Sequence, residues 1–272
     1  METTATLQKM KELLFHPLKE NRELGLMLDR TQFGGQFTHN LEQRNRLVLK
    51  HQNCSLVDLL GMEKLDLEGF KFASLSVEGL PNLEVLDCSL NLLESLKVAN
   101  LPKLQKLDCK GNKIKDLKLV NLPSLEVLYV GNNELEELKV NSIGNLKELG
   151  CGFTNIQQLD LKGLHNLEKL YFDWTPIQSI DLSTLSKLET LHCRKCKLTS
   201  LDLSGLEHLK LVLCAGNELR KLNLKGAKAL FDVHCKMNEI MELDITGLSN
   251  LWRLQTDEDV KVIGQISTKL KR

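Results

Sequence analysis

Residues 83–93 read LEVLDCSLNLL, and residues 104–114 repeat the same pattern as LQKLDCKGNKI after a shift of 21 positions. We number this repeat from 1 to 21, with position 1 at Leu83. Leucine then recurs at position 1 in every repeat as far as Leu251, without an insertion or a deletion. A short fixed period is typical of stacked coils, in which each repeat buries its apolar side against its neighbours.

The apolar columns of the repeat indicate short strands rather than helices. Apolar side chains alternate with polar ones at positions 4 and 6 and again at positions 14 and 16, which is the period of a β-strand. One more full repeat begins at Met62, which makes nine in all. We expect a partial repeat around Leu47, Leu49 and Leu56, and a truncated one after Leu251.

The two quoted segments resemble the leucine-rich-repeat family, and the 21-residue length is similar to its short bacterial subtype. The resemblance implies an α/β leucine-rich-repeat solenoid, curved, with short parallel β-strands on its concave face and extended or turn segments on its convex side. We expect an N-terminal helical cap over residues 1–46, the solenoid over residues 47–256 and a C-terminal cap over residues 257–272.

Composition excludes several functional classes. The chain has 272 residues with 36 basic and 36 acidic side chains, so it lacks the excess positive charge of a nucleic-acid-binding protein. The first 30 residues mix charged and apolar side chains and contain no apolar run that fits a signal peptide or a membrane span. We therefore expect a cytoplasmic protein with no nucleic-acid or membrane partner.

The cysteines are predicted to be core side chains. Six of the eight occupy position 6, a column that holds Val130 and Phe172 in other repeats, so we expect reduced and buried thiols. Cys193 and Cys196 form a CxxC pair next to His192, which leaves a thiol- or metal-responsive protein as the alternative function. Cys196, however, stands at position 9, where the family uses Asn or Cys.

Position 9 is otherwise an asparagine column. Asn112 and its equivalents should satisfy backbone groups of their own and adjacent repeats, because an amide both donates and accepts hydrogen bonds. The column is interrupted at Thr154, Thr175 and Cys196 and, in the first repeat, at Phe70. Neutral drift and a functional departure both explain these interruptions.

Both ends of an open stack need a cover. Leu7, Met10, Leu13 and Leu14 follow helical spacing, and Pro17 stops that helix or starts the next. Leu24, Met27 and Leu28 form a second apolar face before Gly34 and Gly35. A docking site for a partner is the alternative role for these helices. At the other end, Val260, Val262 and Ile266 are expected to close the last coil.

Side chains at positions 3, 5, 7 and 8 should project from the concave face and line up in rows across the repeats. Few residues are aromatic, yet four of them fall on these outward positions within three repeats, with charged neighbours around them. The predicted partner-binding residues are Tyr129, Phe153, Tyr171, Asp173, Trp174, Arg194 and Lys195. Exposed aromatic clusters of this kind favour binding of a protein or peptide. The alternative is that the aromatic rings only cover one another or the threonine gaps.

Position 15 carries Lys97, Lys118 and Lys139 and then changes to aspartates, which should accept hydrogen bonds from the following turn. We interpret the lysines as a solvated face. No nucleophile stands within predicted reach of a base, and the glycines recur as turn residues rather than as a phosphate loop. The sequence therefore predicts a non-catalytic protein-protein interaction module, with no cofactor.

Overall fold

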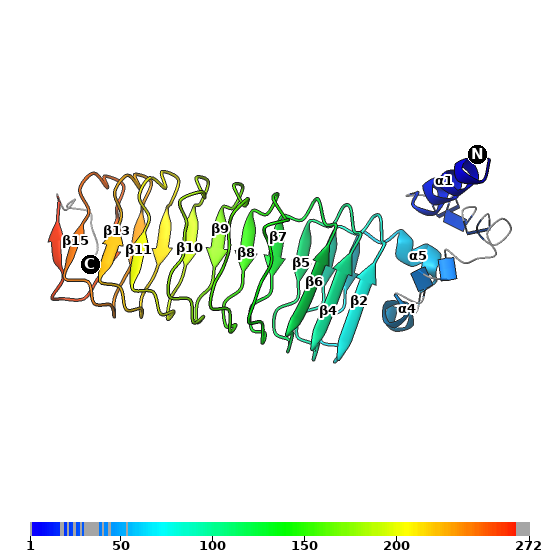
Figure 1. The fold of residues 1–272 in the computed structure, drawn as a ribbon, viewed down its shortest axis with the longest axis horizontal. Coiled ribbons are helices and arrows are strands. Elements are labelled where there is room, and N and C mark those ends of the chain that lie inside the picture. The colour runs from blue at the N-terminus through cyan, green and yellow to red at the C-terminus, as the bar shows by residue number, and fades with distance from the viewer. Residues whose placement is uncertain are drawn as a thin grey trace. The chain divides into compact units, whose positions relative to one another are not determined.

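The computed structural model divides the chain into two compact units, Met1–Leu125 and Glu126–Arg272. It describes residues 2–16, 19–20, 22–23, 26–27, 29, 38–39, 41–42, 45–52 and 54–264. In each unit the 21-residue repeat forms one coil with a short parallel strand at positions 3–5 (Figure 1). None of the helices in the described part is long and apolar enough to cross a membrane.

Unit 1 begins with helices, as the sequence predicts. Helix α1 spans Glu2–Leu14 and buries Met10 and Leu14 completely. The expected second apolar face is not borne out at Met27, which is 56% exposed. The predictions for Pro17, Leu24, Leu28, Gly34 and Gly35 lie outside the described residues.

The partial repeat expected around Leu47, Leu49 and Leu56 is wrong, because this stretch is helical. Helix α4 spans Arg46–Gln52 and α5 spans Leu56–Leu60. Ser55 caps α5: its hydroxyl accepts the backbone N–H of Asp58, and the Asp58 side chain accepts the backbone N–H of Ser55. This capping box satisfies backbone donors that a helix start leaves unpaired, so it favours helix over strand.

The helical segment supplies hydrogen bonds to the first coil. The Asn45 side-chain amide donates to the Glu78 carbonyl at 2.9 Å, and its oxygen accepts the Glu78 backbone N–H at 3.1 Å. These are the two bonds that a neighbouring strand would make to the edge of β2. Asn82 in turn donates to the Leu60 carbonyl at 3.0 Å. Within unit 1 the helices therefore protect an edge that would otherwise be open to another chain.

The strands of unit 1 form two parallel sheets. Strands β1 (Lys64–Asp66), β3 (Val85–Asp87) and β5 (Lys106–Asp108) pair in register at the 21-residue period, so that Leu86 lies beside Leu65 and Leu107. On the opposite side of the coils, β2 (Ser74–Glu78), β4 (Ser95–Ala99) and β6 (Asp116–Val120) pair in the same way and lie side by side in Figure 1.

Unit 2 continues the pattern with a longer sheet at positions 3–5, which Figure 1 shows as a row of parallel arrows. Its strands are, in spatial order, β7 (Val127–Tyr129), β8 (Glu148–Gly150), β9 (Lys169–Tyr171), β10 (Thr190–His192), β12 (Leu211–Leu213), β14 (Asp232–His234) and β16 (Arg253–Gln255). On the other side, strands occur only toward the C-terminus, as β11 (Ser200–Asp202) with β13 (Lys221–Asn223) and β15 (Glu242–Asp244) with β17 (Lys261–Ile263). Val262 pairs with Leu243, as expected for closure of the last coil, and Ile266 lies outside the described residues.

The leucine and cysteine columns form the core. All six cysteines of position 6 are at most 1% exposed: Cys88, Cys109, Cys151, Cys193, Cys214 and Cys235. Burial raises the pKa of these thiols, to about 12 for Cys151 and about 11 for Cys235. The prediction that this column consists of apolar core side chains is confirmed.

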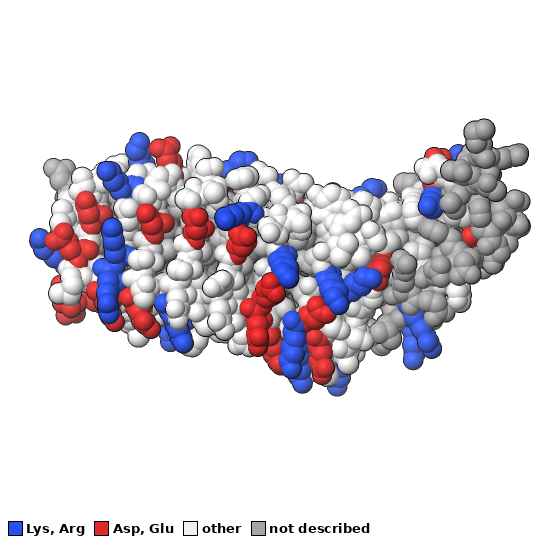
Figure 2. Space-filling view, viewed as in Figure 1, with Lys and Arg blue, Asp and Glu red and all other residues white. Residues whose placement is uncertain are grey.

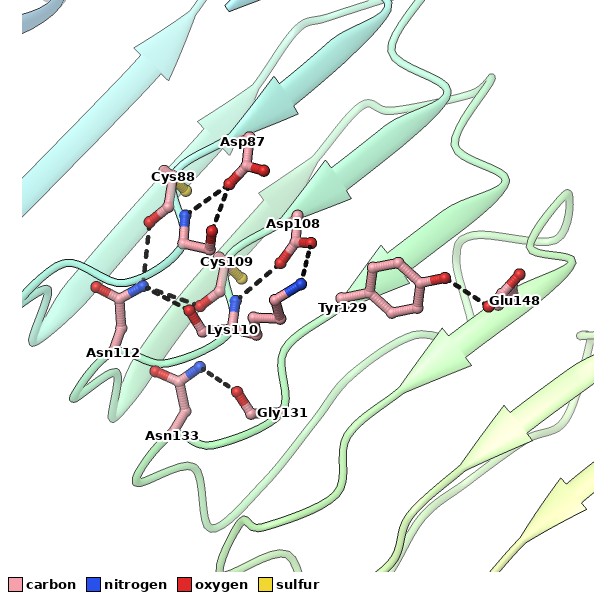
Figure 3. A network of polar contacts seen from close by, with 11 residues as sticks. Asp87, Cys88, Asp108, Cys109, Lys110, Asn112, Tyr129, Gly131, Asn133 and Glu148 are labelled. Atoms are coloured by element: carbon pink, nitrogen blue, oxygen red, sulfur yellow. Dashed lines mark hydrogen bonds and ion pairs between the residues drawn. The ribbon is translucent and has the colours of Figure 1, made fainter. Parts of the chain in front are cut away.

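The asparagine ladder is also confirmed, and Figure 3 shows its members Asn112 and Asn133. The Asn112 side-chain amide donates to the carbonyl of Cys109 in its own repeat at 3.0 Å and to that of Cys88 in the preceding repeat at 3.1 Å. Its oxygen accepts the Leu93 backbone N–H at 3.0 Å. Thr175, by contrast, donates to the Phe172 carbonyl of its own repeat at 2.9 Å and shares a hydrogen bond of 3.4 Å with the Cys196 thiol of the next repeat. Cys196 donates from its thiol to the same carbonyl at 3.2 Å.

Candidate partner-binding surface

Position 8 places side chains on the surface through an unusual backbone. Every residue there from Leu90 to Met237 has a positive φ, including Phe153 at 56°, Trp174 at 58° and Lys195 at 52°. This left-handed region suits glycine, which occupies the position in three other repeats: Gly69, Gly111 and Gly216. A bulky residue costs on the order of 1 kcal/mol more there. A tryptophan at position 8 therefore has no conformational advantage to the fold.

The three consecutive side chains of this row contact one another. The rings of Phe153 and Trp174 stack with centroids 5.7 Å apart and planes inclined by 18°. The Lys195 ammonium lies 4.4 Å from the Trp174 ring centroid, a cation–π geometry. Despite these contacts Phe153 is 57% exposed and Trp174 is 50% exposed. We call Phe153, Trp174 and Lys195 the aromatic row.

Asp173 and Arg194 hold the turn that presents the aromatic row. Asp173 accepts the Arg194 backbone N–H at 2.6 Å with one carboxylate oxygen, and its other oxygen accepts the Arg194 guanidinium at 3.1 Å. The Trp174 backbone N–H in turn donates to the Arg194 carbonyl at 2.8 Å. Two successive turns are thus joined by backbone and side-chain bonds, which hold the backbone that carries the indole.

Tyr171 and His192 lie next to this turn on the sheet face. Their rings meet edge to face at 4.8 Å. Burial is the main cause that lowers the pKa of His192 and raises that of Tyr171. The Nε2 atom of His192 is buried without a hydrogen-bond partner among the described residues. A neutral imidazole with an unused nitrogen is a group that a bound partner can satisfy.

Tyr129 belongs to a second cluster, with Glu148 and Lys169. Its hydroxyl donates to one carboxylate oxygen of Glu148, as Figure 3 shows, and Lys169 donates to the other oxygen at 3.2 Å. The Tyr129 ring lies against Gly150, where an added Cβ would stand 2.9 Å from it. The glycine at position 5 of the next repeat therefore makes room for the ring.

The seven predicted site residues thus fall into three groups: the aromatic row, the Asp173–Arg194 pair, and Tyr129 and Tyr171, which both interact with Glu148. Sequence reasoning missed a further aromatic pair, the exposed Phe231 and the half-buried Trp252. Their rings stack at 5.3 Å with an 11° inclination, and with Lys210 they line a pocket of about 610 Å³. The sequence signal for this pair lies at position 2 of the repeat. Every earlier repeat has a charged or amide side chain there, whereas the last two have the aromatic residues Phe231 and Trp252.

The thiol alternative finds little support in the geometry. Cys193 is fully buried and Cys196 is 6% exposed. Burial is the largest influence on both thiols and raises the pKa of each, so neither is activated as a thiolate. Among the described residues no group of three or more His, Cys, Asp or Glu side chains is arranged to hold a metal ion.

Stacked 21-residue coils with one parallel strand each, an asparagine ladder and a buried leucine core define a class of solenoid proteins. The family model for leucine-rich repeats in two copies matches residues 102–142. The chain has the leucine-rich-repeat fold, and its 21-residue period fits the bacterial type of this repeat. The fold is one that typically serves as a protein-interaction scaffold rather than as an enzyme.

Solved structures share this fold. Internalin C2 from Listeria monocytogenes is 23% identical, with 82% of this chain and 92% of that chain covered and a TM-score of 0.56. The leucine-rich effector protein YopM from Yersinia pestis is 21% identical, with 77% of this chain covered and a TM-score of 0.55. The functional domain of InlJ from L. monocytogenes is 22% identical, with 79% of this chain covered and a TM-score of 0.48. This chain spans 65% of the YopM chain and 58% of the InlJ chain. A comparison with curated proteins finds no match.

Proposed function

We propose that the chain is a non-catalytic interaction module that binds a protein or peptide on the solvent-exposed face of the unit 2 sheet, the face that the sequence predicts to be concave. The contact residues are the aromatic row, Tyr171, Asp173, Arg194 and Tyr129. The observation that carries the proposal is the exposure of Phe153 and Trp174 in a left-handed backbone where glycine would be more stable. Conformational strain at exposed side chains points to a use other than folding.

The alternative, that these rings only cover one another or the threonine gaps, is less well supported. Thr154 and Thr175 are 5% and 3% exposed and donate to carbonyls of their own repeats. The stacked rings still leave about half of each side chain in water. Half-exposed aromatic side chains beside a polar rim are typical of binding hot spots.

The test is a partner search followed by a binding measurement. Purified chain captures partners from source-cell lysate, and each one identified is then titrated against wild type and Trp174→Ala. We expect Trp174→Ala to weaken binding by about 2 kcal/mol, roughly thirtyfold, as at other aromatic hot spots. Trp252→Ala is the matched control, since it removes an indole from the other stacked pair.

Equal melting temperatures of the three proteins exclude unfolding as the cause. A partner that binds Trp174→Ala as tightly as wild type would remove the aromatic row from the site. Loss of binding in Trp252→Ala alone would move the site to the Phe231 pocket.

A further inference from the structure

Unit 1 contains a groove that the proposed interaction surface does not use. Its volume is about 600 Å³, and it lies between helix α4 and the strands β2, β4 and β6. The lining residues with charged or hydroxyl side chains are Arg46, Lys50, Ser74, Ser76, Ser95, Lys97, Asp116 and Lys118. Four of these eight are cationic and one is anionic. Lys97 and Lys118 belong to the position-15 lysines that the sequence suggested were only a solvated face.

Two of the cations already have carboxylate partners. The Lys97 ammonium lies 2.9 Å from Glu78, whose side chain is only 7% exposed, and Lys118 lies 2.9 Å from Asp116. Arg46 and Lys50 are one helical turn apart on α4 and exposed, and neither has a carboxylate partner among the described residues. Figure 2 shows basic side chains over α4, apart from the interleaved charges over β4 and β6. The excess positive charge of the groove is therefore that of Arg46 and Lys50.

Hydroxyl groups complete the donor set. Ser74 and Ser95 are register partners on β2 and β4 and both line the groove. Ser76 donates to Glu78 at 2.6 Å and so helps to hold the carboxylate that orients Lys97. A guanidinium, an ammonium and serine hydroxyls are the donors that bind phosphate oxygens, and the guanidinium can bind two oxygens of one group at once.

We propose that this groove binds a small anion with adjacent phosphate groups. A singly charged carboxylate would leave one of the two excess cations without a counter-charge, whereas a diphosphate neutralises both. Such a ligand would lie between α4 and the serine edge of β2 and β4, with Arg46 and Lys50 on its oxygens. The proposal is independent of the partner-binding surface, because every lining residue belongs to unit 1.

The test is calorimetric titration of the full chain with inorganic pyrophosphate at low salt, with citrate as a polycarboxylate comparison. The decisive variant is Arg46→Gln with Lys50→Gln, since glutamine removes the charge and has a helix propensity similar to that of arginine and lysine. Lys97 is left unchanged, because its removal would take the paired ammonium away from the buried Glu78 carboxylate. The matched control is Lys139→Gln, which removes the next lysine of the same column from outside the groove.

We expect wild type and Lys139→Gln to bind pyrophosphate equally and the double variant to bind it about tenfold more weakly or worse, with citrate weak throughout. Absence of binding by wild type would overturn the proposal. So would equal binding by the double variant, or citrate binding as tight as that of pyrophosphate. Matched circular dichroism spectra and melting temperatures show whether α4 is intact in the double variant.

Discussion

At the scale of single residues, position 8 combines a folding constraint with the binding role that we propose. Its left-handed backbone could have been suspected from the sequence, because glycine occupies the position in several repeats. The aromatic residues at this position were singled out as exposed, which the structure confirms for Phe153 and Trp174. Their stacking, and the bonds between Asp173 and Arg194, depend on side-chain rotamers in adjacent repeats. The aligned repeat sequences do not specify these rotamers.

Trp174 allows backbone strain to be separated from side-chain contacts. Trp174→Ala and Trp174→Gly both remove the indole, but only glycine relaxes a backbone with a φ of 58°. We expect Trp174→Gly to be about 1 kcal/mol more stable than Trp174→Ala in urea unfolding. Both variants should lose the partner to the same extent. If Trp174→Ala proves as stable as Trp174→Gly, the backbone at position 8 is not strained. The exposure of aromatic residues there would then no longer support a binding role.

At the scale of elements, the 21-residue period sets the strand register, because each repeat must place its leucines beside those of the next one. It says nothing about the segment before Met62, where helices α4 and α5 replace the partial repeat that leucine spacing suggested. Leu56, Val57, Leu59 and Leu60 are buried on α5, so the same apolar residues serve a helix once Ser55 caps it. Leucine spacing alone does not distinguish a short helix from a partial repeat, whereas the pairing of Ser55 with Asp58 favours the helix.

The pH dependence of unit 1 tests the cap of α5. Hydrogen bonds from Lys19 and then from Ser55 lower the pKa of Asp58 to about 2, from an ordinary value of 3.8. The folded-state pKa is depressed, so the ionised form contributes stability above pH 4, and this contribution is lost as the pH falls toward 2. Asp58→Asn should therefore be less stable than wild type at pH 6, and the difference should disappear near pH 2.

Urea midpoints at four or five pH values provide the measurement, and Asp259→Asn serves as a control at an exposed carboxylate outside the cap. Because the Asp58 side chain is largely solvated, the expected difference in stability is smaller than a buried ion pair would give. A difference between Asp58→Asn and wild type that stays constant down to pH 2 would contradict the assignment of the low pKa to the hydrogen bonds from Lys19 and Ser55.

At the scale of the whole molecule, stability should be a sum of contributions from neighbouring repeats, because the paired strands lie in adjacent repeats. Leu191 is fully buried, and its register partners are Leu170 and Val212. Leu191→Ala should cost about 2–5 kcal/mol, as other buried leucines do. In a linear array the destabilisation should be largest in the two adjacent repeats and should decrease with distance along the chain.

Hydrogen exchange followed by mass spectrometry resolves that decline. We expect faster exchange in β9, β10 and β12 of Leu191→Ala, and unchanged exchange in β3 and β5. Leu86→Ala is the reciprocal variant, whose effect should be confined to β1, β3 and β5. Uniform acceleration in either variant would mean that the solenoid unfolds as one cooperative body. A partner bound to the aromatic row would then also stabilise the proposed phosphate groove of unit 1, so the same experiment decides whether the two proposed surfaces can be coupled through folding.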